Sequence, residues 1–215
     1  MKNIYLISGL GADDRVFKNL NFYSNKPKVI HWIKNKKNEN LKEYCLRLSD
    51  QIKNKNELVL IGVSFGGIVA IELSKILKTE KLVIISSIKL ASEKPILYNL
   101  AKFSRILNLI PSQIFNFHSF IIDFLFDVNS NEEKKLIKEF IRNNDSDFLK
   151  WSLKEILKWE NRQFPSNIIH IHGEKDKLFP FRKIHNRISI KDGGHFMILN
   201  KHNEISSILK EYNVI

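Results

Sequence analysis

The stretch from residue 58 to residue 77 constrains the fold of this chain more than any other. Residues 58–61 are an unbroken aliphatic run, as expected for a strand buried on both faces. A glycine-rich turn follows directly, and residues 65–77 then have the spacing of a helix that is apolar nearly all round. Such a helix is itself buried. The stretch therefore predicts a parallel sheet with helices packed on it.

Further apolar runs alternate with helical segments along the rest of the chain. The runs predicted as strands are residues 4–7, 29–33, 82–85, 168–171 and a weaker one at 187–190. Helices are predicted at residues 41–52 and at the end of the chain, where Ile205, Ile208, Leu209 and Tyr212 share one face. A chain of 215 residues is long enough for one domain with a sizeable core. We expect a single α/β domain, residues 1–215, with a mostly parallel central sheet flanked by helices.

Residues 88–160 interrupt this alternation. They contain no strand signal, and their apolar residues have helical spacing. A capping box at Ser130 and Glu133 predicts the start of one helix, and another is expected to begin near Asp145. We interpret this phenylalanine-rich block as a helical insertion packed over an edge of the sheet, within the single domain.

The formal net charge of +12 raises the question of an anionic partner, such as nucleic acid or a membrane surface. The basic residues are mostly lysines scattered among asparagine and isoleucine, as at residues 34–38. They form no long stripe with interleaved aromatic residues of the kind that binds single strands. We interpret them as a solvated surface and expect no nucleic-acid partner. Salt-sensitive binding to DNA or RNA would instead indicate the alternative, a nucleic-acid-binding protein.

Several features favour a cytoplasmic protein. No apolar stretch approaches the length of a membrane span, and the first apolar run is too short for a signal peptide. Cys45 is the single cysteine, so no intrachain disulfide can form, which fits a reducing compartment. Its helical spacing with Leu41, Tyr44 and Leu48 predicts a core residue rather than a nucleophile. Nothing in the sequence fixes an oligomeric state.

The residues Gly62-Val63-Ser64-Phe65-Gly66 have the form Gly-x-Ser-x-Gly between a predicted strand and a predicted helix. A turn that tight strains the backbone of the serine, and side chains at the two glycine positions would collide. Ser64 is then exposed at a helix N-terminus, whose dipole favours developing negative charge. We predict that Ser64 is a nucleophile. The alternative is the glycine-rich turn of a nucleotide-binding fold, but neither Gly-x-Gly-x-x-Gly nor a P-loop lysine is present.

Acyl transfer at Ser64 needs backbone N–H groups aimed at the oxyanion of the tetrahedral intermediate. Phe65, directly after the nucleophile, offers one. The glycine-rich segment 8–11 follows the first predicted strand and can offer a second through Leu10. We therefore predict an oxyanion hole made by Leu10 and Phe65.

A serine nucleophile also needs a histidine base, and the histidine needs a carboxylate. Asp176 follows the strand predicted at residues 168–171, and His195 follows the one at 187–190. Ser64, Asp176 and His195 thus each come just past a strand. The carboxyl ends of parallel strands meet at one edge of the sheet. We therefore predict that the three residues form a catalytic triad.

With these residues in place, the chain resembles the α/β-hydrolase family. GVSFG at 62–66, IHGEKDKLFP at 171–180 and GGHF at 193–196 are similar to that family's nucleophile, acid and histidine regions. The resemblance covers nearly the whole chain except residues 88–160, where the family carries a variable helical cap. It implies that no cofactor and no metal take part, and that Leu10 lies beside Ser64.

The chain departs from the family pattern in two ways. Ser8-Gly9 stands where many members have His-Gly, but the expected donor is a backbone N–H. The chain also starts at what would be the family's third strand, so the first two antiparallel strands are expected to be missing.

Other polar residues offer rival interpretations. His170 and His172 share a face of one strand and with Asp176 would resemble metal ligands, but the companion ligands of a hydrolytic site are absent, so we expect structural histidines. Asp192 is a rival acid, but it lies only three positions before His195 and would have to fold back sharply. The roles of a few further residues stay open, namely Asp13, Asp14 and His118 in the expected cap.

We expect a cofactor-free serine hydrolase that cleaves a carboxylic ester or thioester through an acyl-enzyme intermediate. The phenylalanine-rich cap favours an apolar acyl group, so the expected partner is a small-molecule ester. Two alternatives remain. One is another reaction of the same triad, either acyl transfer or C–C bond hydrolysis, and the other is a non-catalytic ligand-binding protein that retains the triad.

Overall fold

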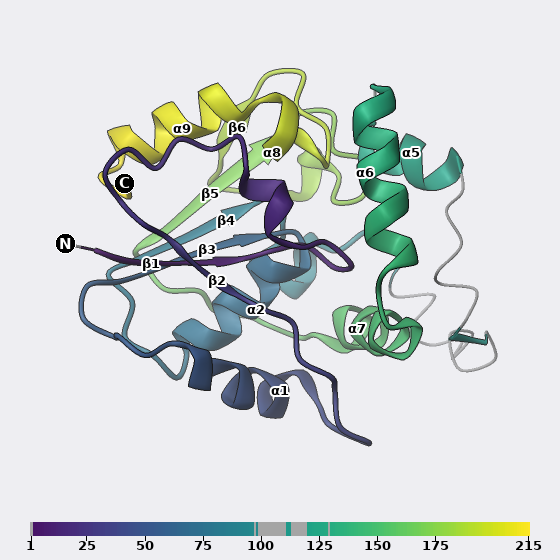
Figure 1. Ribbon diagram of the computed structural model, residues 1–215, viewed down its shortest axis with the longest axis horizontal. Coiled ribbons are helices and arrows are strands. Elements are labelled where there is room, and N and C mark those ends of the chain that lie inside the picture. The colour runs from purple at the N-terminus through teal and green to yellow at the C-terminus, as the bar shows by residue number, and fades with distance from the viewer. Residues whose placement is uncertain (1, 97, 99–110, 113–119, 129) are drawn as a thin grey trace.

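The computed structural model describes residues 2–96, 98, 111–112, 120–128 and 130–215 (Figure 1). Its centre is a six-stranded sheet in the order β2-β1-β3-β4-β5-β6. The strands are β1 Asn3–Ile7, β2 Lys28–Ile30, β3 Leu58–Val63, β4 Lys81–Ile85, β5 Ile168–Gly173 and β6 Ile188–Ile190. Every pairing in this sheet is parallel, which confirms the predicted fold class. In the described part of the chain no antiparallel strand adjoins it.

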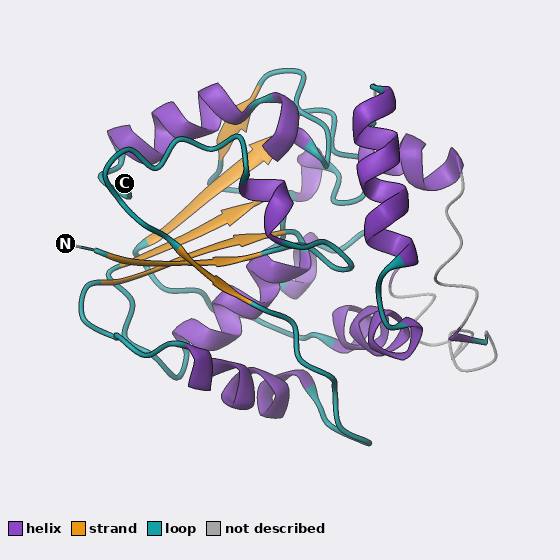
Figure 2. Ribbon diagram, in the orientation of Figure 1, coloured by secondary structure: helices purple, strands orange, loops and turns teal. Residues whose placement is uncertain are grey.

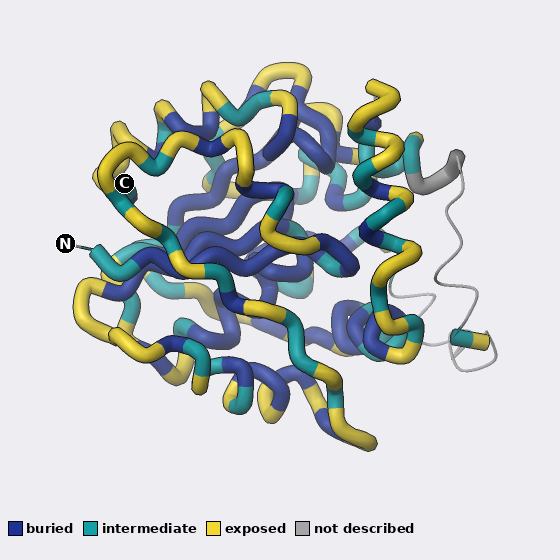
Figure 3. Tube along the Cα trace, viewed as in Figure 1, coloured by how far each residue is buried: buried dark blue, intermediate teal, exposed yellow. Residues whose placement is uncertain are grey.

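Helices cover both faces of the sheet (Figures 1 and 2). α1 (Leu41–Leu48) and α2 (Phe65–Ser74) lie on one face, and α8 (Met197–Asn200) and α9 (His202–Glu211) lie on the other. Side chains of a strand alternate between the two layers. In β1, Tyr5 packs toward α1 and α2, and Leu6 packs toward α9. The central strands are therefore buried on both faces, as Figure 3 shows, which explains their unbroken apolar sequences.

Between β4 and β5 the structure contains α5 (Phe120–Phe126), α6 (Asn131–Arg142) and α7 (Ser146–Lys158). They lie beyond the carboxyl ends of the strands (Figure 1). The predicted capping box at Ser130 and Glu133 begins α6, and Asp145 caps α7. Part of residues 88–160, including His118, lies outside the described residues.

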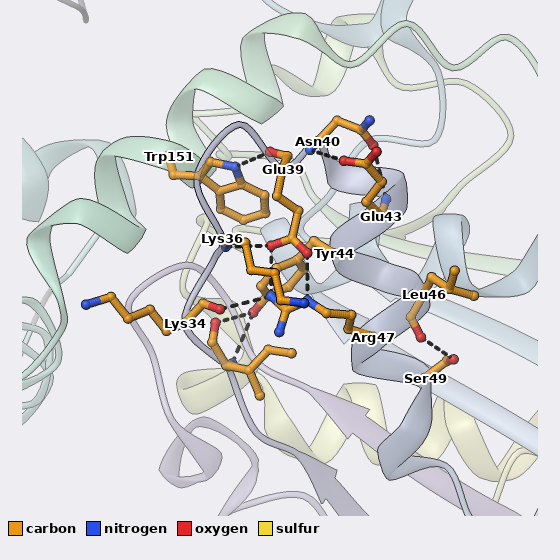
Figure 4. Close-up of polar contacts among 11 residues, drawn as sticks. Lys34, Lys36, Glu39, Asn40, Glu43, Tyr44, Leu46, Arg47, Ser49 and Trp151 are labelled. Atoms are coloured by element: carbon orange, nitrogen blue, oxygen red, sulfur yellow. Dashed lines mark hydrogen bonds and ion pairs between the residues drawn. The ribbon is translucent and has the colours of Figure 1, made fainter.

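Polar contacts fix α7 to the layer of α1 and α2. The indole Nε1 of Trp151 donates to the backbone oxygen of Glu39 at 2.8 Å (Figure 4), and the side chain of Glu155 accepts the N–H of Leu41 at 3.0 Å. Trp159, at the C-terminal end of α7, donates to Glu72 of α2 at 2.7 Å. These bonds attach α7 to the layer of α1 and α2. Within the described ranges, every helix is too short or too polar to span a bilayer.

Candidate active site

Ser64 occupies the turn between β3 and α2. Its φ of 53° and ψ of −118° lie outside the regions that serine ordinarily adopts, so the backbone is strained there. Two hydrogen bonds hold the strained residue: its N–H donates to the oxygen of Ile85 at 2.9 Å, and Ser87 Oγ donates to its carbonyl oxygen at 2.7 Å. Both partners come from the end of β4 and the loop after it. The neighbouring strand thus supports the turn.

The glycines around Ser64 are required by close backbone approach. A β-carbon at Gly62 would collide with the backbone of Gly66, and one at Gly66 would collide with the carbonyl oxygens of Ile7 and Ser8. The end of β1 therefore lies against the first turn of α2. This contact explains why the loop after β1 borders Ser64.

The structure brings Ser64, His195 and Asp176 together. Nε2 of His195 lies 2.9 Å from Oγ of Ser64, and Nδ1 lies 2.9 Å from Oδ2 of Asp176. Nδ1 carries the proton because its neighbour is a carboxylate that can only accept. Nε2 is then a free acceptor for the hydroxyl proton of Ser64. This arrangement lets His195 act as a base toward Ser64.

Asp176 is buried, and its loop supplies the hydrogen bonds that a buried carboxylate needs. Oδ1 accepts the backbone N–H groups of Leu178 and Phe179, each at 2.9 Å. Burial alone would raise the pKa of Asp176, but the electrostatic interaction and hydrogen bond with His195, the nearby His172 and the N–H of Phe179 together bring that pKa below its ordinary value. Asp176 is therefore an anion at neutral pH.

Two aromatic rings enclose the imidazole of His195. Phe126 and Phe179 both meet it edge to face, with ring centroids 5.1 and 5.6 Å away. His195 itself is 1% exposed. The rings limit rotation of the imidazole and keep water from the line between Asp176 and Ser64.

Two backbone N–H groups near Ser64 have no acceptor among the described residues. Leu10 lies in the loop after β1, and a β-carbon on the adjacent Gly9 would lie 3.5 Å from Cβ of Ser64. Phe65 is the first residue of α2. Within the described part of the chain, neither the N–H of Leu10 nor that of Phe65 donates a hydrogen bond. Both N–H groups are therefore left as unused hydrogen-bond donors in this part of the structure.

No protein-family model matches the sequence, and no curated protein matches it either. Several solved structures do match it in fold. A thermophilic esterase from Thermogutta terrifontis has a TM-score of 0.66 at 15% identity, with 99% of this chain and 89% of that one covered. A bromoperoxidase from Bacillus anthracis has a TM-score of 0.65 at 16% identity, with coverage of 100% and 92%. A meta-cleavage product hydrolase from Pseudomonas fluorescens IP01 has a TM-score of 0.66 at 14% identity, with coverage of 99% and 90%.

The chain has the α/β-hydrolase fold. These likenesses cover 99–100% of the chain. In this α/β-hydrolase-fold protein, Ser64 lies at the carboxyl end of the central strand β3. This strand has β1 on one side and β4 on the other. The sheet order therefore explains how residues far apart in the sequence meet at one edge.

A cavity of about 330 Å³ opens at Ser64 and His195. Aliphatic and aromatic side chains form most of its wall, with Ile137, Phe140 and Ile141 from α6 and Leu153, Ile156 and Leu157 from α7. No Asp, Glu, Lys or Arg of the described residues lines it. Its volume is near the lower end of the ~300–1,000 Å³ typical of small-molecule sites. The cavity thus suits a small, uncharged, apolar group.

The structure separates the rival residues from this site. Asp192 is exposed and pairs with Lys175 at 2.7 Å, so it does not reach His195. Asp13 caps the 3₁₀ turn Asp14–Phe17 and binds Arg15, and both Asp13 and Asp14 point to solvent rather than line the cavity. Among the described residues, no group of three or more histidine, cysteine or acidic side chains is placed to hold a metal ion.

Some buried polar residues were not predicted from the sequence. Ser87 supports the carbonyl of Ser64, and Lys89 and Glu93 form an ion pair at 3.0 Å that is almost wholly buried. Charges four residues apart ordinarily indicate an exposed helix face. In the structure, Lys89 instead contacts His170 of β5 and His185 in the loop after it, and the pair is internal.

Proposed function

We propose that this protein is a serine hydrolase that cleaves a neutral carboxylic ester or thioester with an apolar acyl group. The observation that carries the proposal is the continuous line of hydrogen bonds from Ser64 through His195 to Asp176, each 2.9 Å long, which opens into the apolar cavity. The esterase and the hydrolase with the same fold also support hydrolytic chemistry.

In the first half-reaction, Ser64 Oγ bonds to the substrate carbonyl carbon while its proton passes to Nε2 of His195. The carbonyl oxygen becomes an oxyanion that accepts the N–H groups of Leu10 and Phe65. His195 then gives its proton to the departing alcohol or thiol. The acyl group is left as an ester of Ser64.

In the second half-reaction, water takes the place of the alcohol. The water oxygen attacks the acyl carbon while His195 removes a proton from the water. His195 then returns that proton to Ser64 Oγ as the bond between the acyl carbon and Oγ breaks. Asp176 stays ionised throughout and stabilises the imidazolium form of His195. The products are a carboxylic acid and the regenerated enzyme.

We also propose that residues 88–160 act as a cap that shapes the acyl site. α6 and α7 supply six apolar side chains to the cavity wall, and the bonds from Trp151, Glu155 and Trp159 hold α7 in place. A fixed apolar wall selects acyl groups by length and excludes charged ones, because burying an unpaired charge is unfavourable.

A panel of p-nitrophenyl esters of graded acyl length tests this function. We expect hydrolysis with an optimum at short to medium chains, and loss of about 10⁶-fold in kcat for Ser64→Ala. Ser207→Ala, on the exposed side of α9, is the matched control and keeps wild-type rates. Failure of the wild type to hydrolyse any ester, together with thermal stabilisation by such ligands, would instead indicate a non-catalytic binding protein. Turnover only with an added acceptor alcohol, or only of a C–C bond, would indicate the other triad reactions.

A further inference from the structure

His172 is a fully buried histidine that the reaction scheme leaves unused. It lies on β5, with its side chain on the same face as His170. Its Nε2 is 2.8 Å from the carbonyl oxygen of Phe179 and 3.5 Å from Oδ2 of Asp176. Its Nδ1 has no hydrogen-bond partner among the described residues. The histidine thus contacts the back of the loop that carries the proposed catalytic acid.

The surroundings of His172 fix where its proton lies. Both groups facing Nε2 are acceptors, so Nε2 carries the hydrogen and donates it to the carbonyl of Phe179. A second proton on Nδ1 would bury an N–H group without an acceptor. Burial lowers the pKa of His172 and outweighs the opposing effect of Asp176. His172 is therefore a neutral donor at physiological pH.

The hydrogen bond from His172 means that both backbone polar groups of Phe179 have partners. The N–H of Phe179 is held by Oδ1 of Asp176, and its carbonyl is held by His172. The ring of Phe179 in turn packs against His195. Movement of Phe179 would therefore turn the carboxylate and loosen the imidazole together.

The neighbouring His170 supports this arrangement from behind. Its Nε2 lies 3.0 Å from the oxygen of Ser87, and its Nδ1 lies 3.1 Å from the ammonium of Lys89. It meets His172 edge to face, with ring centroids 5.3 Å apart. His172 is thus held between His170 and the acid loop.

We propose that His172 is a positioning residue, which holds the loop 176–179 so that Oδ2 of Asp176 faces Nδ1 of His195. His172 touches neither the cavity nor the reacting atoms. The inference rests on the proposed Ser64–His195–Asp176 chemistry for its effect on rate. Its effect on the geometry of the His195–Asp176 bond is independent of any substrate.

Two substitutions separate donation by His172 from simple filling of space. His172→Phe keeps the ring and removes the donor. His172→Gln replaces the ring with an amide whose N–H groups reach about as far as Nε2. Ile169→Val, on the opposite face of the same strand, is the control for a mild loss of packing. We expect kcat to fall about 10- to 100-fold in His172→Phe with KM nearly unchanged, and to recover in His172→Gln.

The substrate-free readout is the low-field proton NMR signal of the Nδ1–H of His195. We expect it in the wild type, in His172→Gln and in Ile169→Val, and expect it weakened or shifted in His172→Phe. If His172→Phe does not fold, His172→Asn takes its place, because asparagine is polar but too short to donate to Phe179. An unchanged signal in a folded donor-less variant overturns the proposal, as does equal loss of the signal in His172→Gln. If no ester is hydrolysed, the NMR comparison still decides the positioning role while the proposed function fails separately.

Discussion

Replacing Asp176 with asparagine keeps the shape of the side chain and tests where the proton of His195 lies. Oδ1 of Asp176 accepts two backbone N–H groups, from Leu178 and Phe179. In the variant, the amide oxygen has to take that position, because an amide nitrogen there would face two donors. The amide nitrogen consequently faces His195, at the place where Oδ2 now accepts Nδ1–H.

A donor facing Nδ1 reverses the tautomer of His195. Nδ1 becomes the acceptor, the proton moves to Nε2, and Nε2 can no longer take the hydroxyl proton of Ser64. A wrong tautomer of this kind lowers kcat about 10⁴-fold. At 1.36 kcal/mol for each factor of ten, the barrier rises by about 5 kcal/mol. The fold changes little, since the side chain keeps its volume and its bonds to the loop.

The assay is hydrolysis of the best p-nitrophenyl ester, with thermal unfolding measured on the same samples. Asp192→Asn is the matched control, because Asp192 is an exposed acid in the segment just before His195 and pairs only with Lys175 among the described residues. We expect Asp192→Asn to keep the wild-type kcat. A folded Asp176→Asn variant with kcat within tenfold of the wild type would refute the tautomer argument.

Four further outcomes follow from the structure. His195→Ala should lower kcat by several orders of magnitude in a protein that still folds, as measured by ester hydrolysis and by calorimetry. Gly66→Ala should destabilise the fold by about 3 kcal/mol or more in denaturant titrations, since its β-carbon meets the carbonyls of Ile7 and Ser8. Burial lowers the pKa of His170 and His172, so the unfolded chain binds more protons. The free energy of unfolding should therefore fall below about pH 6.5, by up to about 1.4 kcal/mol per pH unit for each histidine. Leu153→Trp should narrow the cavity and shift the ester preference toward shorter acyl chains in the same panel.

The sequence predicted the sheet and the meeting of Ser64, Asp176 and His195 because these features depend on local patterns. Buried parallel strands need unbroken apolar runs, and the turn at Ser64 needs glycines where backbones touch. The ends of elements were less predictable. The helix expected at residues 41–52 ends at Leu48 and continues as a 3₁₀ turn, Ser49–Gln51, and the helix expected at residues 65–77 ends at Ser74. Such ends depend on tertiary contacts that periodicity does not report.

The surroundings of Ser64, His195 and Asp176 could not be predicted for a different reason. His172 binds a backbone carbonyl, and a backbone partner leaves no residue type in the sequence to recognise. Lys89 and Glu93 resemble a surface pair until β5 and the loop after it bury them. Residues that act through packing or through the main chain therefore became visible only in three dimensions.

Covalent labelling of Ser64 tests the central claim most directly. The wild-type protein, treated with a fluorophosphonate probe, should gain the mass of one adduct, and peptide mapping should place it on Ser64. Ser64→Ala should gain none, and His195→Ala should react far more slowly because its serine lacks a base. A wild-type protein that stays unlabelled, or a Ser64→Ala variant that labels as fast as the wild type, would contradict the account.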